Sequence, residues 1–307
     1  MRIAVMGAGG LGGYFGARLA LSGADVHFIA RGRHLQALRD DGLQIVGPEP
    51  LQVPRVNATD DARSIGVVDL VLLCVKLWDT EAALEQIRPL MGAATAIVSF
   101  QNGVLKDEPL RAAFGDAAVM GGVGYVATTI ERPGVIRQTG TMQRLVFGEF
   151  DGTRSVRALA FLDACLAGGI RAELAGDIRR EIWQKFVFLA ALSGATTTMR
   201  RPIGPIREHP QTRAFLLDLM REVVAVGRAQ GVALAEDYAE QRLKLADDVA
   251  YDMTSSMHHD LEQGRPLEVR WLAGAVMALG GQAGVPTPLN RAIADILALH
   301  AEGGASR

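Results

Sequence analysis

The sequence of 307 residues predicts an α/β amino-terminal domain with a doubly wound parallel sheet, followed by an all-α carboxy-terminal domain. Three observations predict this fold class. Short apolar segments alternate with amphipathic segments in the first half, and a glycine-rich turn follows the first apolar segment. From Asp177 onward, nearly every segment has helical periodicity. We therefore place the boundary near Gly176, which gives domains 1–176 and 177–307.

The apolar segments of the first half have the length of strands, at 2–6, 25–30, 70–75, 96–100 and 118–121. Amphipathic segments of helical period lie between them, at 11–22, 33–40, 80–91 and 110–114. Strands that read as unbroken hydrophobic runs between helices are typical of a parallel sheet covered on both faces.

The pattern changes after Val123, where YVATTIERPGVIRQTGTMQRLVFGEF is rich in β-branched residues around a Pro133-Gly134 turn. This segment predicts antiparallel strands that close the sheet. A helix over 156–167 and a strand over 171–174 complete the first domain. The second domain is predicted as helices, separated by prolines and glycines, at 177–199, 211–230, 236–252, 255–263, 267–279 and 288–301. The closing EGGASR is expected to be a frayed tail.

The composition excludes several classes of protein. Lys plus Arg total 32 against 34 Asp plus Glu, so no basic excess points to nucleic acid or to an anionic membrane. Two cysteines exclude a disulfide framework and a four-cysteine metal site, and no other pattern suggests a metal. The longest uncharged run, 271–290, is broken by glycines and prolines, and the first residues lack the pattern of a signal peptide. We expect a cytoplasmic protein with a small-molecule substrate.

A glycine-rich loop follows the first predicted strand. Gly7-Ala8-Gly9-Gly10-Leu11-Gly12 matches G-x-G-x-x-G, in which the first glycine permits a tight turn and the second lets pyrophosphate approach the backbone. The third lets helix and strand pack closely, and the helix directs its amino-terminal N–H groups at the phosphates. The loop therefore predicts a Rossmann-type dinucleotide site that includes Gly7, Gly9, Gly10, Leu11 and Gly12.

An arginine stands where an NAD-binding site usually carries an acid. Arg31 lies 19 residues beyond Gly12 (31 − 12), at the end of the second predicted strand. A carboxylate at this position accepts a bond from the ribose 2′-hydroxyl, whereas a guanidinium pairs with a 2′-phosphate. Arg31 therefore predicts NADPH as the cofactor, although a solvated surface arginine is the alternative.

Polar residues gather in three further segments. Lys185 begins an uncharged run of a predicted helix, where it either meets an anion and does chemistry or extends to water from a core helix. Lys76 lies at the end of one predicted strand and Asn102 just after the next, at the rim where doubly wound sheets bind ligands, although Asn102-Gly103 is also a strong turn signal. In TSSMHHDLEQGRPLEVRW, Ser256 and Glu268 could face a cleft. The adjacent His258 and His259 are interpreted as a solvated helix face.

With these residues placed, the whole chain from residue 1 to about 300 resembles the ketopantoate reductase family, the NADPH-dependent 2-dehydropantoate 2-reductases. The resemblance rests on the order and spacing of GAGGLGG, Arg31, CVKLWD, QNG, PGVIRQTG, WQKF and TSSMHHDLEQGRPLE. It implies reduction of 2-dehydropantoate to pantoate in pantothenate biosynthesis. It also implies catalytic roles for Lys185, as general acid, and for Glu268, which holds the substrate's distal hydroxyl. Asn102 and Ser256 are implied to contact substrate, and Lys76 to lie by the nicotinamide.

The chain departs from the family pattern at three positions. Leu189, Ser193 and Met253 stand where the family usually carries asparagines. Such amides discriminate strongly between polar and apolar substrates. Three alternatives therefore stay open: a reductase of a more apolar 2-oxo acid or ketone, a related β-hydroxyacid or opine-type dehydrogenase, and a non-catalytic NADPH sensor. A homodimer formed through the apolar helices of the second domain is also expected.

Overall fold

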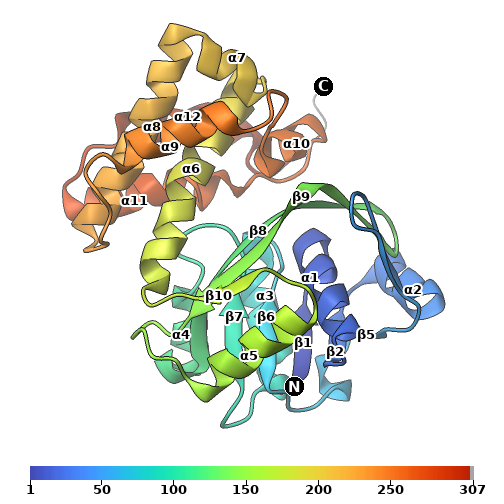
Figure 1. Cartoon of the computed structure of the whole chain (residues 1–307). Helices are drawn as coiled ribbons and strands as arrows, with labels where there is room; N and C mark the ends of the chain where they lie inside the picture. The colour runs from blue at the N-terminus through green and yellow to red at the C-terminus, as the bar shows by residue number, and fades with distance from the viewer. Residues whose placement is uncertain (305–307) are drawn as a thin grey trace. The chain divides into compact units, whose positions relative to one another are not determined.

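The computed structural model describes residues 1–304, and these form two compact units (Figure 1). The sheet unit comprises Met1–Asn102 and Lys106–Glu181; the helical unit comprises Gly103–Leu105 and the chain from Ile182 onward. The division between these units falls inside helix α6 (Ile178–Met199). The first turn of α6 belongs to the sheet unit because the Ile178 side chain lies directly against Gly121. The domain limits 1–176 and 177–307 stay a prediction.

One sheet organises the sheet unit, and within residues 1–304 it has ten strands in the order β4-β3-β9-β8-β7-β6-β1-β2-β5, with β10 on β9. Its strands are β1 (Arg2–Met6), β2 (Asp25–Ile29), β3 (Leu43–Val46), β4 (Leu51–Val53), β5 (Asn57–Thr59), β6 (Leu70–Leu73), β7 (Ala96–Ser99), β8 (Val119–Arg132), β9 (Val135–Gly148) and β10 (Ala172–Leu174). Neighbours from β5 to β8 are parallel, and β8 pairs with β9 in antiparallel fashion. The predicted α/β class is confirmed.

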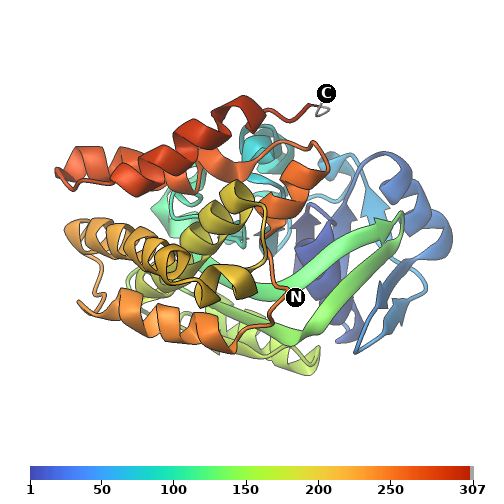
Figure 2. The ribbon, with the colours of Figure 1, turned by 90° about the horizontal axis from the view of Figure 1, so that it is seen from above.

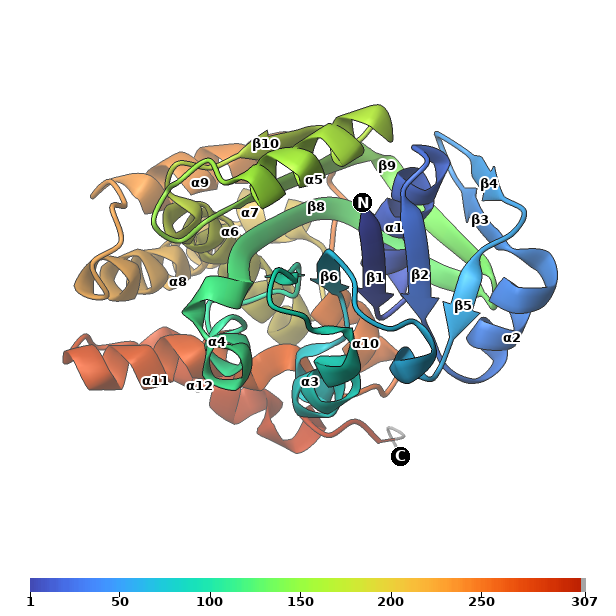
Figure 3. The ribbon, with the colours of Figure 1, turned by 90° about the horizontal axis from the view of Figure 1, so that it is seen from below.

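Helices cover both faces of this sheet. Figure 3 shows α1 (Gly10–Leu21) and α5 (Val156–Ala167) on one face, and α3 (Thr80–Ile87) and α4 (Glu108–Phe114) on the other. Each face has its own apolar core, one with the rings of Phe15, Phe28 and Phe161, the other with Ile87 and Leu110. Burial on both faces explains why the central strands are continuously apolar in sequence.

The predicted antiparallel closure is confirmed, although the strands are longer than expected. The expected strand at 118–121 is only the beginning of β8, and β8 and β9 each extend for 14 residues, as the long hairpin in Figure 2 shows. Gly134 makes the turn with a φ of 76°. Strands β3, β4 and β5 were not expected, because three or four residues of mixed polarity carry too short an alternation to be recognised.

Helices make up the helical unit from α6 onward. They are α7 (Ile203–Glu208), α8 (Pro210–Ala229), α9 (Tyr238–Asp248), α10 (Ser256–Glu262), α11 (Ala273–Ala283) and α12 (Pro288–Leu297). Trp183, Phe186, Leu216 and Val276 lie in their shared core. The expected helix over 267–279 is wrong in its first half, since a 3₁₀ turn (Glu268–Arg270) precedes α11 and Leu272 leaves helical geometry between them. The short α7 was not expected.

No helix within residues 1–304 is long and apolar enough to cross a bilayer. Of the tail expected at EGGASR, residues 305–307 lie outside the described part of the chain.

Candidate functional site

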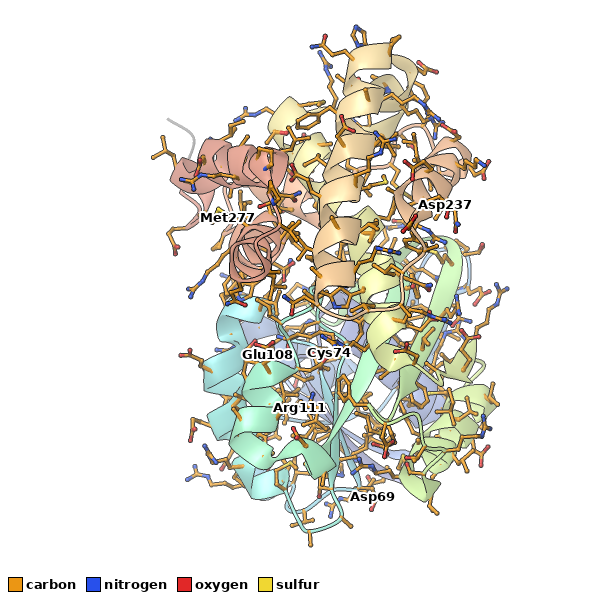
Figure 4. All side chains as sticks on the ribbon, turned by 90° about the vertical axis from the view of Figure 1, so that its left-hand side faces the viewer. Asp69, Cys74, Glu108, Arg111, Asp237 and Met277 are labelled. Carbon is orange, nitrogen blue, oxygen red and sulfur yellow. The ribbon has the colours of Figure 1, made fainter. Side chains whose placement is uncertain are left out.

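The carboxyl ends of four neighbouring parallel strands bring most of the predicted cofactor residues to one edge of the sheet unit. The glycine loop follows β1, Arg31 follows β2, Lys76 follows β6 and Asn102 follows β7. Main-chain hydrogen bonds join these strand ends, from Cys74 N to Met6 O at 2.8 Å and from Phe100 N to Leu73 O at 3.0 Å. Figure 4 labels Asp69 and Cys74 at the two ends of β6, and Cys74 marks this carboxyl edge.

The glycine loop is tightly packed at Gly7 and Gly12 and open at Gly9. Gly7 has a φ of 97°, and a Cβ on it would lie 2.9 Å from Val75 N; a Cβ on Gly12 would lie 2.2 Å from Gly7 O. At Gly9, by contrast, a Cβ would meet no atom of the described chain within 4 Å beyond its own local backbone and chain neighbours. Helix α1 begins there without a side-chain cap or a first-turn acid among residues 1–304. The open space at Gly9 and the uncapped helix end fit a bound pyrophosphate.

Gly10 and Leu11 complete the loop. A Cβ on Gly10 would lie 2.6 Å from Thr128 O, so this glycine permits close packing of the loop against β8. Leu11 is half-buried and packs against the adjoining apolar core.

A histidine that sequence reasoning missed holds this loop in place. His34, in the first turn of α2 (Gly32–Asp41), lies with Nε2 2.8 Å from Ala8 O, and its Nδ1 accepts the N–H of Gly134 at 3.1 Å. Because Nδ1 accepts a bond, Nε2 carries the proton and the ring is neutral. Burial, which outweighs the hydrogen bond to Ala8, lowers the pKa of His34 and favours this neutral form. The loop, α2 and the hairpin turn are thereby tied together.

Arg31 is the N-cap residue of α2, and its side chain is 62% exposed. Its Nη2 lies 3.6 Å from Oδ1 of Asp79, which directly precedes α3. An exposed pair of this kind contributes little and is readily exchanged for a stronger anion. The first turn of α2 contains no acidic residue, so both the guanidinium and the helix dipole favour a phosphate at this point.

Lys76 and Asn102 lie on the segments that follow the next two strands. Lys76 is the N-cap residue of a 3₁₀ turn (Leu77–Asp79), and its Nζ lies 5.3 Å from the ring centroid of Trp78. Asn102 is half-buried and follows the buried Gln101. Cys74 is no nucleophile at this edge, because burial raises the pKa of its thiol to about 12.

The remaining predicted residues belong to the helical unit. Lys185 is half-buried on α6, Glu268 is buried in the 3₁₀ turn before α11, and Ser256 is the exposed first residue of α10. Ser255 is the N-cap of α10, since its Oγ accepts from His258 N at 3.1 Å, and it lies 3.1 Å from Thr196 Oγ1 on α6. The segment that carries Ser256 is therefore tied to the helix that carries Lys185.

The interpretation of the two histidines as a solvated face is wrong for His258. This side chain is buried, with Nδ1 2.8 Å from Thr196 O and Nε2 3.1 Å from Glu262 Oε1, whereas His259 is exposed. Helical geometry places adjacent residues on different faces, and the face of His258 packs against α6.

The three departures from the family pattern also lie in the helical unit. Leu189 and Met253 are half-buried and pack against the helical core. Ser193 is buried, and its hydroxyl has no hydrogen-bond partner within the described chain. At two of the three positions, an apolar side chain therefore stands where the family usually carries an asparagine.

A Rossmann-type sheet with a glycine cradle at its carboxyl edge defines a class of dinucleotide-binding proteins. The family model described as ketopantoate reductase PanE/ApbA matches residues 3–152, and the model of its carboxy-terminal part matches residues 177–301. The chain belongs to the ketopantoate reductase family and is an oxidoreductase that acts on a 2-oxo acid.

Individual relatives agree with this assignment. The chain is 35% identical to a 2-dehydropantoate 2-reductase of Mesorhizobium japonicum, over 94% of each chain, and 32% identical to the uncharacterized oxidoreductase YkpB of Bacillus subtilis, over 94% of this chain and 95% of that one. The crystal structure of 2-dehydropantoate 2-reductase from Geobacter metallireducens matches with a TM-score of 0.91 and 31% identity, covering 97% of this chain and 99% of that one.

Proposed function

We propose that this protein uses NADPH to reduce a 2-oxo acid to the 2-hydroxy acid, and that 2-dehydropantoate is its substrate. The observation that carries the choice of NADPH is Arg31, which stands at the end of β2 and caps a helix without first-turn acids. A 2′-phosphate there would meet a guanidinium and the positive end of α2, whereas NADH would offer neither of them a partner.

Lys185 is the proposed general acid. Addition of hydride to a ketone builds negative charge on the carbonyl oxygen, and a bound nicotinamide would supply that hydride. The ammonium of Lys185 stabilises the charge and delivers the proton from Nζ to oxygen. Its half-buried position on α6 supports this role, because partial removal from water strengthens an ammonium's effect on a nearby anion.

The other roles follow the family resemblance. Glu268 is proposed to accept the distal hydroxyl of the substrate, and its burial would strengthen that hydrogen bond. Ser256 and Asn102 are proposed to contact the substrate, and Lys76 to lie beside the nicotinamide. Ser256 is exposed and Asn102 half-buried, so both side chains are accessible to a ligand.

The test is the oxidation of NADPH by the purified protein with 2-dehydropantoate, beside the Lys185→Ala variant. An efficiency of about 10⁴ M⁻¹s⁻¹ or more, lost in the variant, would support the proposal. Negligible turnover with intact NADPH binding would reject 2-dehydropantoate as the substrate.

A second candidate substrate is a more apolar 2-oxo acid. Leu189 and Met253, which stand in place of family asparagines and are half-buried, favour it. A panel of 2-oxo acids with polar, branched aliphatic and aromatic side chains separates the two candidates. Higher kcat/KM for the apolar members, reversed by Leu189→Asn, would favour the second candidate.

The proposed homodimer through the helical unit has a separate test. Sedimentation velocity at micromolar concentration should give a mass of two chains. A single-chain mass at that concentration would contradict the dimer.

A further inference from the structure

A chain of buried hydrogen bonds joins the segments that follow β6 and β7. It starts at the carbonyl of Leu77, which accepts from Thr80 Oγ1 at 2.8 Å, and Thr80 Oγ1 in turn accepts from Gln101 Nε2 at 2.9 Å. Gln101 Oε1 accepts from Ser99 Oγ at 3.0 Å, and Ser99 Oγ also lies 3.3 Å from Gln101 N. Each of the three side chains is buried, so each bond forms away from competing water.

A buried ion pair extends the chain of bonds to the start of α4. Lys106 is 2% exposed, and its Nζ donates to Ser99 O at 2.8 Å and to both carboxylate oxygens of Asp107, at 2.9 and 3.0 Å. Ser99 ends β7, and Asp107 is the N-cap residue of α4. Lys106 therefore closes the base of the segment 100–105, which begins with Phe100, Gln101 and Asn102.

Lys76 and Asn102 are the chain neighbours of two residues in this arrangement, Leu77 and Gln101. Lys76 directly precedes Leu77, and its carbonyl accepts from Asp79 N at 2.9 Å within the same turn. Asn102 directly follows Gln101. A buried ion pair is weak evidence for stability, so we consider instead the conformation that this pair would specify.

We propose that the bridge of Thr80, Gln101 and Ser99, anchored by Lys106, is a positioning device that fixes Lys76 and Asn102 relative to each other. Its residues act through these two neighbours and touch no reacting group. The expected effect on kcat rests on the proposed function. The expected effect on the two segments that the bridge joins rests on the structure alone. A displacement of about 1 Å in residues that orient substrate can cost about 100-fold in rate.

The sheet unit offers a matched pair of threonines for the test. Thr80 is 6% exposed, donates to Leu77 O and accepts from Gln101 Nε2. Thr95 is 3% exposed, donates to Val68 O at 2.6 Å and accepts from Gly92 N at 2.9 Å, at the opposite end of β7. Thr→Val removes one buried hydroxyl at each site, so the two variants should lose similar stability. Only Thr80→Val should change the segments that follow β6 and β7.

The kinetic experiment compares Thr80→Val, Thr80→Ser and Thr95→Val with the wild type. We expect kcat to fall at least tenfold in Thr80→Val while the dissociation constant of NADPH changes less than threefold. Thr80→Ser should restore kcat, and Thr95→Val should stay within twofold of the wild type. Equal effects of the two valine variants on kcat would overturn the inference. If Thr80→Val does not fold, Gln101→Met breaks the same bridge from its other side.

Amide hydrogen exchange supplies a readout that does not depend on turnover. Thr80→Val should speed exchange at both 76–79 and 100–102, whereas Thr95→Val should leave both segments unchanged. Absence of turnover in the wild type would reject the proposed function, and exchange would still decide the inference. Unchanged exchange at either segment in Thr80→Val would overturn it.

Discussion

At the scale of single residues, the proposed preference for NADPH depends on Arg31. Arg31→Ala should weaken NADPH binding at least tenfold and leave NADH binding within twofold, because only NADPH carries the phosphate that the guanidinium pairs with. Titration of each cofactor by fluorescence measures both constants. The matched control is Arg39→Ala, which removes a positive charge from the last turn of the same helix. An unchanged NADPH-to-NADH ratio in Arg31→Ala would reject the assignment.

Asp79 lies where it would oppose the proposed 2′-phosphate. Its carboxylate pairs with Arg31 and would repel a dianion, so Asp79→Asn should tighten NADPH binding about two- to fivefold, the range of an exposed ion pair of up to about 1 kcal/mol. NADH binding should not change. Asp60→Asn is the control, since Asp60 makes a similar exposed pair with Arg39 at 3.5 Å. Weaker NADPH binding in Asp79→Asn would instead show that Asp79 helps to orient Arg31.

Lys185 is the proposed general acid of the chemical step. Lys185→Ala should lower kcat by more than about 100-fold, because it removes both the proton donor and the charge opposite the developing oxyanion. The dissociation constant of NADPH should change little. Lys244→Ala, at an exposed lysine of the same unit, is the control and should keep full activity. Retained turnover in Lys185→Ala would exclude the lysine as general acid.

At the scale of an element, Glu149 joins the end of β9 to the start of α5. Its carboxylate accepts from Arg157 Nε and Nη2 at 2.7 Å and from Ser155 Oγ at 2.6 Å. Burial opposes ionisation of Glu149, but the hydrogen bonds from Arg157 and Ser155 outweigh it and hold the pKa of this carboxyl below its usual range.

A carboxyl whose pKa is lower in the folded state than in the unfolded state stabilises the fold at pH values above its unfolded-state pKa. This stabilisation is lost as the pH falls through the folded-state pKa. Glu149→Gln should therefore lower the free energy of unfolding by about 1–3 kcal/mol at pH 7, and the difference should shrink at pH values below about 4. Urea unfolding at several pH values measures it. Glu236→Gln, at a side chain that is 87% exposed, should have little effect at any pH. A difference that grows on acidification would contradict the argument.

At the scale of the whole molecule, cofactor binding should raise the free energy of unfolding. A ligand that binds only the folded chain adds about 2.7 kcal/mol when its free concentration is 100 times Kd. NADPH should therefore raise the unfolding temperature more than the same concentration of NADH does. In Arg31→Ala, the two cofactors should raise it equally. Equal shifts in the wild type would contradict a preference for NADPH.

The sequence predicted most of the fold, because the strongest local signals coincide with burial. Strands β6 and β7 are buried throughout and β1 nearly so, which makes their sequences almost continuously apolar, and the long helices carry a regular period. The elements that the sequence did not predict are short or irregular. Strands β3, β4 and β5 take their structure from neighbours in the sheet, and the turn before α11 follows from one residue, Leu272, that leaves helical geometry.

For the site, the sequence by itself predicted the residues with a local signature: the glycine loop, Arg31, and the family segments around Lys76, Asn102 and Lys185. Only the tertiary structure decided how some of these residues are held. His34 meets Ala8 and Gly134, Asp79 meets Arg31, and Thr80 meets Gln101. These partners lie on different elements, 21 to 100 residues apart for the hydrogen-bonded pairs. Their pairing depends on strand order in the sheet, which no local pattern of residues encodes.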